Sequence, residues 1–311
     1  MISHNETNDT NEQIFTLVSY IVGSISIVGG VFSIFLFWFF KEIRLFIYEL
    51  IMYISASRVI LDIAGFLPVK DVTNGDQKDQ KNLIYCSIQG ILNITCQKFS
   101  WIVCTYVIYF SYYQEVKGEK LQTQSKILRL KLLLPAFLFS LAFALIAFFT
   151  DYIKKEDAGF FCTLMKPHKD SSHRLVVISY LIDIFFIVLN AYLIIRVTIL
   201  IRKMRNKGHE LRKMFFVVMF FPVLNFMCWL PSFFHSVQSL KELEHNHSLL
   251  LSLLISICSG IFTFLCGVLY SLLPHMKISL KAFLRSLFGC VHEFDLLEQT
   301  DFEDAADLAN R

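Results

Sequence analysis

Residues 14–40 read IFTLVSYIVGSISIVGGVFSIFLFWFF, a run of 27 residues without a charged side chain. An α-helix rises about 1.5 Å per residue, so about 20 apolar residues cross the ~30 Å hydrocarbon core of a bilayer. The run is therefore long enough to span a membrane. It is too long for the apolar region of a signal peptide, so we expect it to be retained and to act as the targeting signal.

Six further apolar stretches follow, each separated from the next by a polar or charged turn. With the first, they occupy about residues 14–40, 45–67, 83–113, 128–150, 174–201, 213–236 and 248–273. The third is the longest, as expected for a tilted helix through the centre of a bundle. Of the 311 residues, 55% are hydrophobic and only 18% are charged, with a mean hydropathy of +0.54. A soluble domain needs more charge to cover its surface. The sequence predicts an all-α fold, a seven-transmembrane helix bundle over residues 14–273.

The distribution of Lys and Arg predicts which helix ends face the cytosol. If the N-terminus lies outside, the inner connections carry seventeen basic residues, the outer connections nine, and residues 1–13 none. The positive-inside rule therefore places the tail of residues 1–13 outside and the C-terminus inside. Glycosylation sequons at Asn5 and Asn8 in this tail, and at Asn246 in the last outer loop, agree with that orientation.

Two of the eight cysteines fall on the predicted outer side. Cys86 lies at the start of the third span and Cys162 in the loop after the fourth, where an oxidising compartment would let them close a disulfide. On the inner side, residues 274–290 are predicted to form a short amphipathic helix along the membrane interface. It ends at Cys290, a candidate acylation site. Residues 291–311 form an acidic tail that we expect to be disordered.

The sixth span contains the sequence FPVLNFMCWLP, from Phe221 to Pro231. Proline lacks an N–H and its ring crowds the carbonyl four residues back, so Pro222 and Pro231 each interrupt helical hydrogen bonding. Two interruptions allow the inner end of the helix to swing, with Trp229 near the hinge. A helix that is merely bent is the alternative, because proline is common in membrane helices.

These residues resemble motifs of known receptors. Cys-Trp-Leu-Pro at 228–231 is similar to the hinge motif of rhodopsin-like receptors, and the preceding Phe221-Pro222 resembles the cyclic-AMP-receptor-like family of slime moulds and other protists. Similar patterns of that family occur at 53–57 (YISAS), at Phe99-Ser100-Trp101 with Tyr106 and Tyr109, and at Gly260 with 267–270 (GVLY). The cysteine pair matches the disulfide of most such receptors. The resemblance implies a G-protein-coupled receptor.

The chain also departs from the rhodopsin-like pattern. The third span ends in YFSYY at 109–113 in place of Asp-Arg-Tyr, and the seventh span lacks Asn-Pro-x-x-Tyr. Arg58 stands in the second span, where many receptors have an Asp. These differences argue against an ordinary rhodopsin-like receptor and against a sodium site.

Four charged residues lie at membrane depth, where charges are costly and usually face the bundle interior. Arg58 and Asp62 are four residues apart, so they share a helix face and can pair. Lys98 and Asp183 lie at comparable depths in the third and fifth spans and could pair between these helices. Such pairs are either structural locks or contacts of a polar ligand pocket that rearrange on activation. The sequence leaves both interpretations open.

The last inner loop leads into the sixth span and is basic. Its residues Arg202, Lys203, Arg205 and Lys207 are expected to contact either anionic lipid headgroups or an acidic protein partner, here the G protein.

Together these features predict a cell-surface receptor, multi-pass in the plasma membrane, that transmits an extracellular ligand signal to a heterotrimeric G protein. The ligand would favour the state in which the inner end of the sixth helix has moved outward, because only differential binding shifts such an equilibrium. The ligand is not readable from the sequence, and a cyclic nucleotide is implied by the resemblance alone. Membrane lipid is expected as a partner, and nucleic acid is not.

Other functions agree less well with the sequence. We expect no enzyme activity, cofactor or metal, because the only His within a span is His235, near its end, and no HExxH, GxSxG or P-loop motif occurs. A light sensor would need a Lys in the seventh span, which has none. The alternative is a transporter or channel for a small polar solute. The odd number of spans and the lack of corresponding broken helices in two halves argue against it.

Overall fold

The structure, a computed structural model, describes residues 4–40, 46–66, 80–117, 126–150, 152–155, 162–164, 174–203, 220–225, 254, 257–258, 260–265 and 268. Five helices are described along their whole length. They are α1 (His4–Phe39), α2 (Phe46–Gly65), α3 (Gln80–Lys117), α4 (Lys126–Phe149) and α5 (Arg174–Lys203). Residues 220–225, the sixth-helix segment, and residues 260–265, the seventh-helix segment, are also helical.

The first five predicted spans each coincide with one of these helices. The sixth and seventh are helical where they are described, and their remaining residues lie outside the described part of the chain. The largest difference is at the start of α1, which begins at His4 rather than near residue 14. Residues 4–13 are polar but include no Gly or Pro, so nothing in them ends the helix. At 36 residues, α1 is about 54 Å long and extends beyond a ~30 Å hydrocarbon core.

Within the described residues, four helices are apolar and long enough to cross a membrane: Leu17–Phe39, Ile84–Tyr113, Arg129–Phe149 and Arg174–Leu200. Helix α2 is not among them because it contains Glu49, Arg58 and Asp62. Glu49 and Arg58 are buried, and Asp62 is half-buried. Because the charges of α2 avoid the outer surface of the bundle, they do not prevent this helix from lying in the bilayer.

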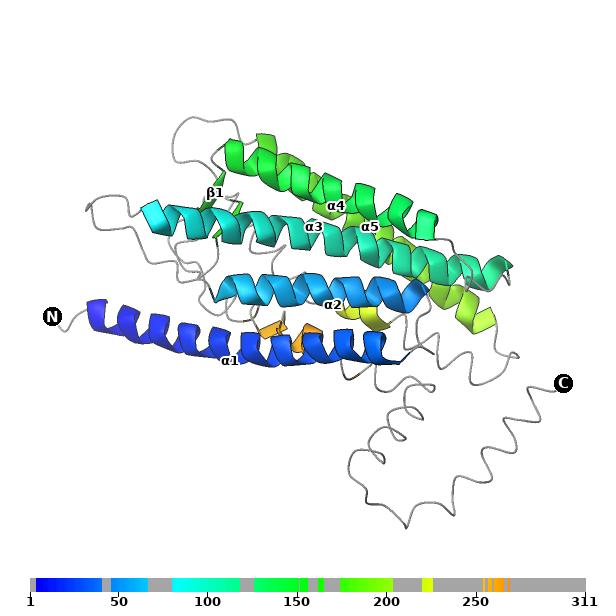
Figure 1. Ribbon diagram of the computed structural model, residues 1–311, viewed down its shortest axis with the longest axis horizontal. Coiled ribbons are helices and arrows are strands. Elements are labelled where there is room, and N and C mark those ends of the chain that lie inside the picture. The colour runs from blue at the N-terminus through cyan, green and yellow to red at the C-terminus, as the bar shows by residue number, and fades with distance from the viewer. Residues whose placement is uncertain are drawn as a thin grey trace, which may run out of the picture.

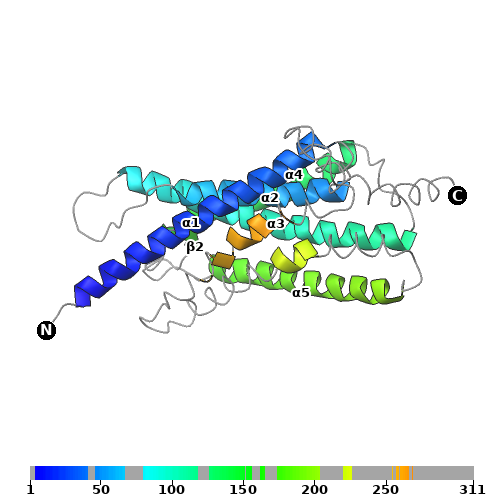
Figure 2. The ribbon, with the colours of Figure 1, turned by 90° about the horizontal axis from the view of Figure 1, so that it is seen from below.

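Helix α3 occupies the centre of the bundle, as the length of the third span predicted. It packs against α2, α4 and α5 and against both short strands, while α1 packs on α2. Figure 1 shows α1, α2, α3 and α4 side by side in that order, and Figure 2 shows α5 alongside α3. The start of α1 and the strands lie toward the same end of the bundle.

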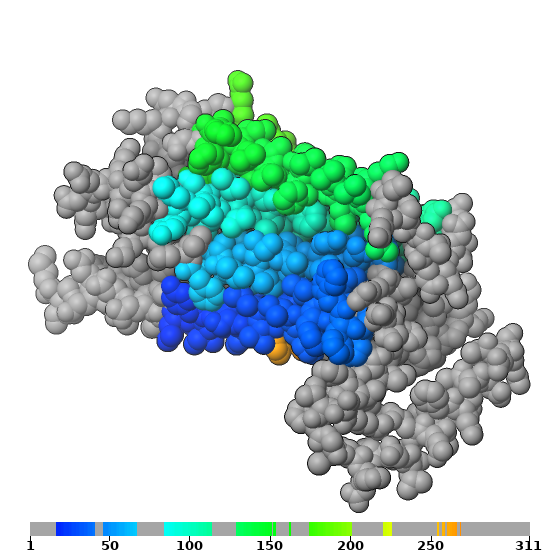
Figure 3. Space-filling view, viewed as in Figure 1, coloured from blue at the N-terminus to red at the C-terminus, as the bar shows by residue number. Residues whose placement is uncertain are grey.

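Apolar side chains cover the outside as well as the inside of the bundle. The face in Figure 3 is formed by α1 to α4. Large hydrophobic residues are exposed along α1, α4 and α5, among them Val28, Trp38, Leu130, Phe149, Phe185 and Val188. A water-soluble protein rarely exposes continuous apolar surface of this extent. The chain is therefore a membrane protein whose outer surface contacts lipid.

A small hairpin connects α4 to α5. Strand β1 (Ile153–Lys155) pairs antiparallel with β2 (Cys162–Leu164), and Lys155 lies opposite Cys162. The sequence predicted only a loop here, because strands of three residues are too short to show an alternating pattern. The side chain of Ile153 lies against Gly90 of α3, where a Cβ atom would collide with it. The hairpin thus packs directly on the central helix.

Candidate functional site

The first predicted site feature, the disulfide, is present. Cys86, near the start of α3, is bonded to Cys162 of β2, with their Cα atoms 5.3 Å apart. Gln89, one turn further along α3, is fully buried beside it. Its Oε1 accepts the Cys162 N–H at 2.8 Å, and its Nε2 donates to the Ala64 carbonyl at 3.1 Å. Gln89 therefore fixes the hairpin to α3 and to the end of α2, a role that sequence analysis missed.

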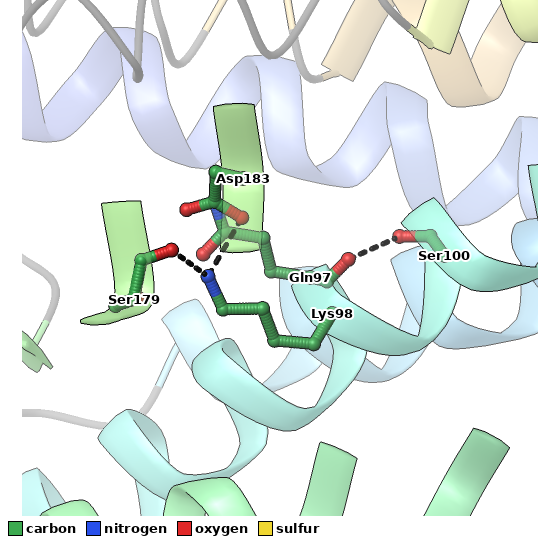
Figure 4. Close-up of polar contacts among 5 residues, drawn as sticks. All are labelled: Gln97, Lys98, Ser100, Ser179 and Asp183. Carbon is green, nitrogen blue, oxygen red and sulfur yellow. Dashed lines mark hydrogen bonds and ion pairs between the residues drawn. The ribbon is translucent and has the colours of Figure 1, made fainter. Parts of the chain in front are cut away.

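The predicted pairing of Lys98 with Asp183 is also present. The Lys98 Nζ lies 2.6 Å from Asp183 Oδ1, and the two side chains are only 2% and 11% exposed. Nζ also donates to the Ser179 carbonyl at 3.3 Å and lies 5.5 Å from the centre of the Phe143 ring on α4. Figure 4 shows the lysine of α3 reaching between the Ser179 and Asp183 positions of α5.

These contacts account for the whole ammonium group. An ammonium has three protons, and here a carboxylate, a carbonyl and an aromatic face surround it. An anionic ligand would have to displace Asp183 to reach Lys98. Of the two interpretations that the sequence left open, the geometry of this pair favours the structural lock between α3 and α5.

A second polar contact joins the same two helices. Thr105 Oγ1 donates to Asn190 Oδ1 at 2.9 Å. Lys98 and Thr105 are seven residues apart on α3, and Asp183 and Asn190 are seven residues apart on α5. The two contacts are therefore separated by two helical turns on each helix. Trp101 lies between them in sequence and belongs to a buried cluster, with Leu61 and Cys96, against which Phe186 and Ile187 of α5 pack. Helices α3 and α5 therefore meet along a seam with one fixed register, and the equal spacing was a signal that the sequence offered.

The predicted Arg58–Asp62 pair has contacts that extend beyond α2. Asp62 accepts a hydrogen bond from Ser26 Oγ of α1. Arg58 is 1% exposed, and its Nη2 donates to Asn225 Oδ1 of the sixth-helix segment at 3.3 Å. Its guanidinium carbon lies 5.3 Å from the centre of the Phe262 ring in the seventh-helix segment. The direct pairing of Arg58 with Asp62 stays a prediction.

The predicted hinge is described only at its first proline. Pro222 is buried within the helical sixth-helix segment, one turn before Asn225. Trp229 and Pro231 lie outside the described residues. Asn225 was quoted in the sequence motif, but its contact with Arg58 was not foreseen, because the two residues are 167 positions apart.

The remaining predicted site residues are placed only in part. Asn5 and Asn8 belong to the first turns of α1, and Arg202 and Lys203 belong to the last turn of α5. The residues Arg205, Lys207, Asn246 and Cys290 lie outside the described part of the chain. Their predicted roles in G-protein contact, glycosylation and acylation stay predictions.

An ion pair that sequence analysis missed lies at the end of α2 opposite the disulfide. Arg129 Nη1 of α4 is 2.7 Å from Glu49 Oε2, and Tyr53 Oη donates to Glu49 Oε1 at 3.4 Å. Glu49 is buried, while the Arg129 side chain is 32% exposed. Nothing in the sequence placed these two spans together at this depth. Among the described residues, no three His, Cys, Asp or Glu side chains gather in a metal-binding arrangement.

The fold resembles that of solved receptors, although the sequence does not. No protein-family profile matches the chain, and no curated protein matches it. The crystal structure of squid rhodopsin superposes with a TM-score of 0.69 over 96% of this chain and 91% of that one, at 15% sequence identity. The chain therefore has the seven-helix fold of G-protein-coupled receptors.

Proposed function

We propose that this protein is a G-protein-coupled receptor that carries an extracellular ligand signal to a heterotrimeric G protein. The observation that carries the proposal is the match to a receptor fold over nearly the whole chain. The distribution of basic residues supports an extracellular N-terminus. The Cys86–Cys162 disulfide lies at the opposite end of the bundle from Arg202 and Lys203 in the last turn of α5, which supports the same orientation, because disulfides persist in oxidising compartments.

The signal would pass through the sixth helix. Pro222 and Pro231 each interrupt the hydrogen bonding of this helix, so its inner part can pivot about them, with Trp229 near the hinge. A ligand among the outer halves of the third, fifth, sixth and seventh helices would favour the pivoted state. The inner cavity so opened would admit the C-terminus of Gα, and Arg202, Lys203, Arg205 and Lys207 would contact the G protein or lipid.

The finer assignments belong to the same proposal. We place the receptor in the plasma membrane, with glycans on the outer sequons, an interfacial helix over residues 274–290 and an acyl chain on Cys290. The sixth-span motif and its preceding Phe-Pro pair support membership of the cyclic-AMP-receptor-like family. On that basis a small polar ligand, with cyclic nucleotides first, is the class to screen.

A nucleotide-exchange screen tests the proposal. The chain is co-expressed with each class of Gα, and GTP-analogue binding is measured against a library that includes cyclic nucleotides. We expect at least one ligand and Gα combination to raise exchange above that of cells without the receptor. Ligand-gated conductance or solute uptake with no exchange on any Gα would instead identify a channel or transporter.

The orientation is tested separately. Asn5→Gln with Asn8→Gln should lower the apparent mass of the surface protein, and adding Asn246→Gln should bring it to that of the enzymatically deglycosylated chain. An antibody tag at residue 1 should be accessible on intact cells. A tag accessible only after permeabilisation would contradict the proposed topology.

A further inference from the structure

Arg58 lies where three parts of the bundle meet. It is in the middle of α2, about 18 Å along the helix from Phe46, and is 1% exposed. Its guanidinium donates to Asn225 of the sixth-helix segment and lies over Phe262 of the seventh-helix segment. One side chain of α2 thus contacts both the sixth-helix and the seventh-helix segments.

We propose that Arg58 is a positioning residue that holds the sixth-helix segment in its resting place through Asn225, so that receptor activation breaks this hydrogen bond. The proposal rests on the proposed function, because it names what restrains the helix that must move. It also makes a claim about the conformation of the protein that does not depend on a G protein.

The chemistry of arginine explains why this contact acts as a restraint. A guanidinium stays charged in proteins, so Arg58 cannot lower its cost of burial by losing a proton. Its donors must be matched by acceptors wherever the helices move. Displacing Asn225 removes one charge-assisted hydrogen bond, which corresponds to a shift of about tenfold or more in a two-state equilibrium.

The position of Asn225 makes the restraint effective. It lies in the stretch between Pro222 and Pro231, so it belongs to the part of the helix that moves when the inner part pivots about the break at Pro231. A hydrogen bond at this point opposes rotation of the segment.

Substitutions at Asn225 with opposite expected effects provide the test. Asn225→Asp converts the acceptor into a carboxylate, which binds a guanidinium more strongly. This substitution therefore stabilises the resting state relative to the active state. Asn225→Leu removes the acceptor and therefore destabilises the resting state relative to the active state. Leu224→Ala is the matched control, because Leu224 belongs to the same segment and packs on the core. Its truncation leaves the Arg58 acceptor in place.

The helix position is read without a G protein, by pulsed electron paramagnetic resonance in lipid nanodiscs. One nitroxide replaces Tyr109, which is 47% exposed on α3, and the second replaces Lys213 at the predicted inner end of the sixth span. Asn225→Leu should raise the population at the longer distance about tenfold relative to the shorter one, and Asn225→Asp should lower it by a similar factor. Leu224→Ala should leave the ratio unchanged.

The same variants in an Arg58→Gln background separate a restraint from a general packing effect. Without the cation, the Asn225→Asp carboxylate is buried unpaired, so it should raise the longer-distance population instead of lowering it. Reversal of the sign supports the proposal. Equal effects of Asn225→Asp and Asn225→Leu, or effects independent of Arg58, would overturn it.

Ligand-free nucleotide exchange then links the restraint to signalling, with exchange raised in Asn225→Leu and lowered in Asn225→Asp. If the label distances follow the expected pattern but wild-type protein activates no Gα with any ligand, the proposed function fails while the restraint stands. If wild-type protein activates a Gα and all variants signal as wild type does, the restraint is refuted and the receptor function stands.

Discussion

The Lys98–Asp183 pair makes a quantitative prediction about stability. Lys98→Met leaves Asp183 as a buried carboxylate with no cation, and Asp183→Leu leaves Lys98 as a buried ammonium with no anion. Because the side chains are only 2% and 11% exposed, water cannot replace the lost partner. Breaking a buried pair from one side costs about 3–5 kcal/mol. Replacing both members by apolar residues of similar size is often neutral or favourable, so the double variant should regain most of that loss.

The assay is thermal unfolding in detergent with a thiol-reactive dye, which reacts as the buried Cys96 and Cys104 become exposed. Each single variant should lower the unfolding midpoint by roughly 6–10 °C, and the double variant should return to within about 3 °C of wild type. Lys131→Met on α4 removes an exposed lysine and is the control for loss of charge alone.

Additivity is the result that would refute this reasoning. If the double variant unfolds at a midpoint lowered by the sum of the two single shifts, the charges do not stabilise each other, and the lock between α3 and α5 does not exist. The single variants should also alter basal or ligand-driven signalling. Wild-type signalling and surface level in both would remove the pair from the mechanism while leaving it a structural contact.

Three further predictions concern other contacts. Gly29→Ala should destabilise the protein by about 1–3 kcal/mol, because the added Cβ would meet the backbone of the seventh-helix segment. Gly23→Ala is the control and should be nearly neutral in the same thermal assay, because its Cβ would meet only an aromatic ring edge at 3.3 Å. Gln89→Leu should leave the disulfide intact on non-reducing gels and speed hydrogen exchange of the hairpin amide that it binds, and unchanged exchange would refute its role. Glu49→Gln should lower the unfolding midpoint by less than half the Lys98→Met shift, because its partner Arg129 is 32% exposed to solvent, and an equal shift would contradict this estimate.

The architecture was readable from the sequence because membrane spans impose a length and a composition on their segments. The first five spans agree with the observed helices to within a few residues, except at the polar start of α1. The rhodopsin-like fold confirms the predicted class of architecture. The hairpin was missed, because its strands are short and are held by tertiary contacts rather than by their own pattern.

The candidate site was predictable where charge alone identified it. Lys98 and Asp183 stand out as charges in apolar spans, and their similar depth predicted their pairing. The partners of Arg58 were not predictable, because Asn225 is a neutral residue in a distant helix, and only the packing of the helices brings it near. Gln89 was missed for the same reason, since nothing in its sequence neighbourhood shows that its side chain accepts a hydrogen bond from a backbone N–H of the hairpin.

The common seven-residue spacing along the α3–α5 seam limits which changes in chain length the protein tolerates. One residue inserted between Asp183 and Asn190 would rotate the second contact by about 100° and move it about 1.5 Å along the axis, so Thr105 would lose its hydrogen bond to Asn190. Compensation would require a matching insertion between Lys98 and Thr105. Homologues should therefore preserve both intervals even where the side chains within them differ, and length variation should be confined to the connecting loops.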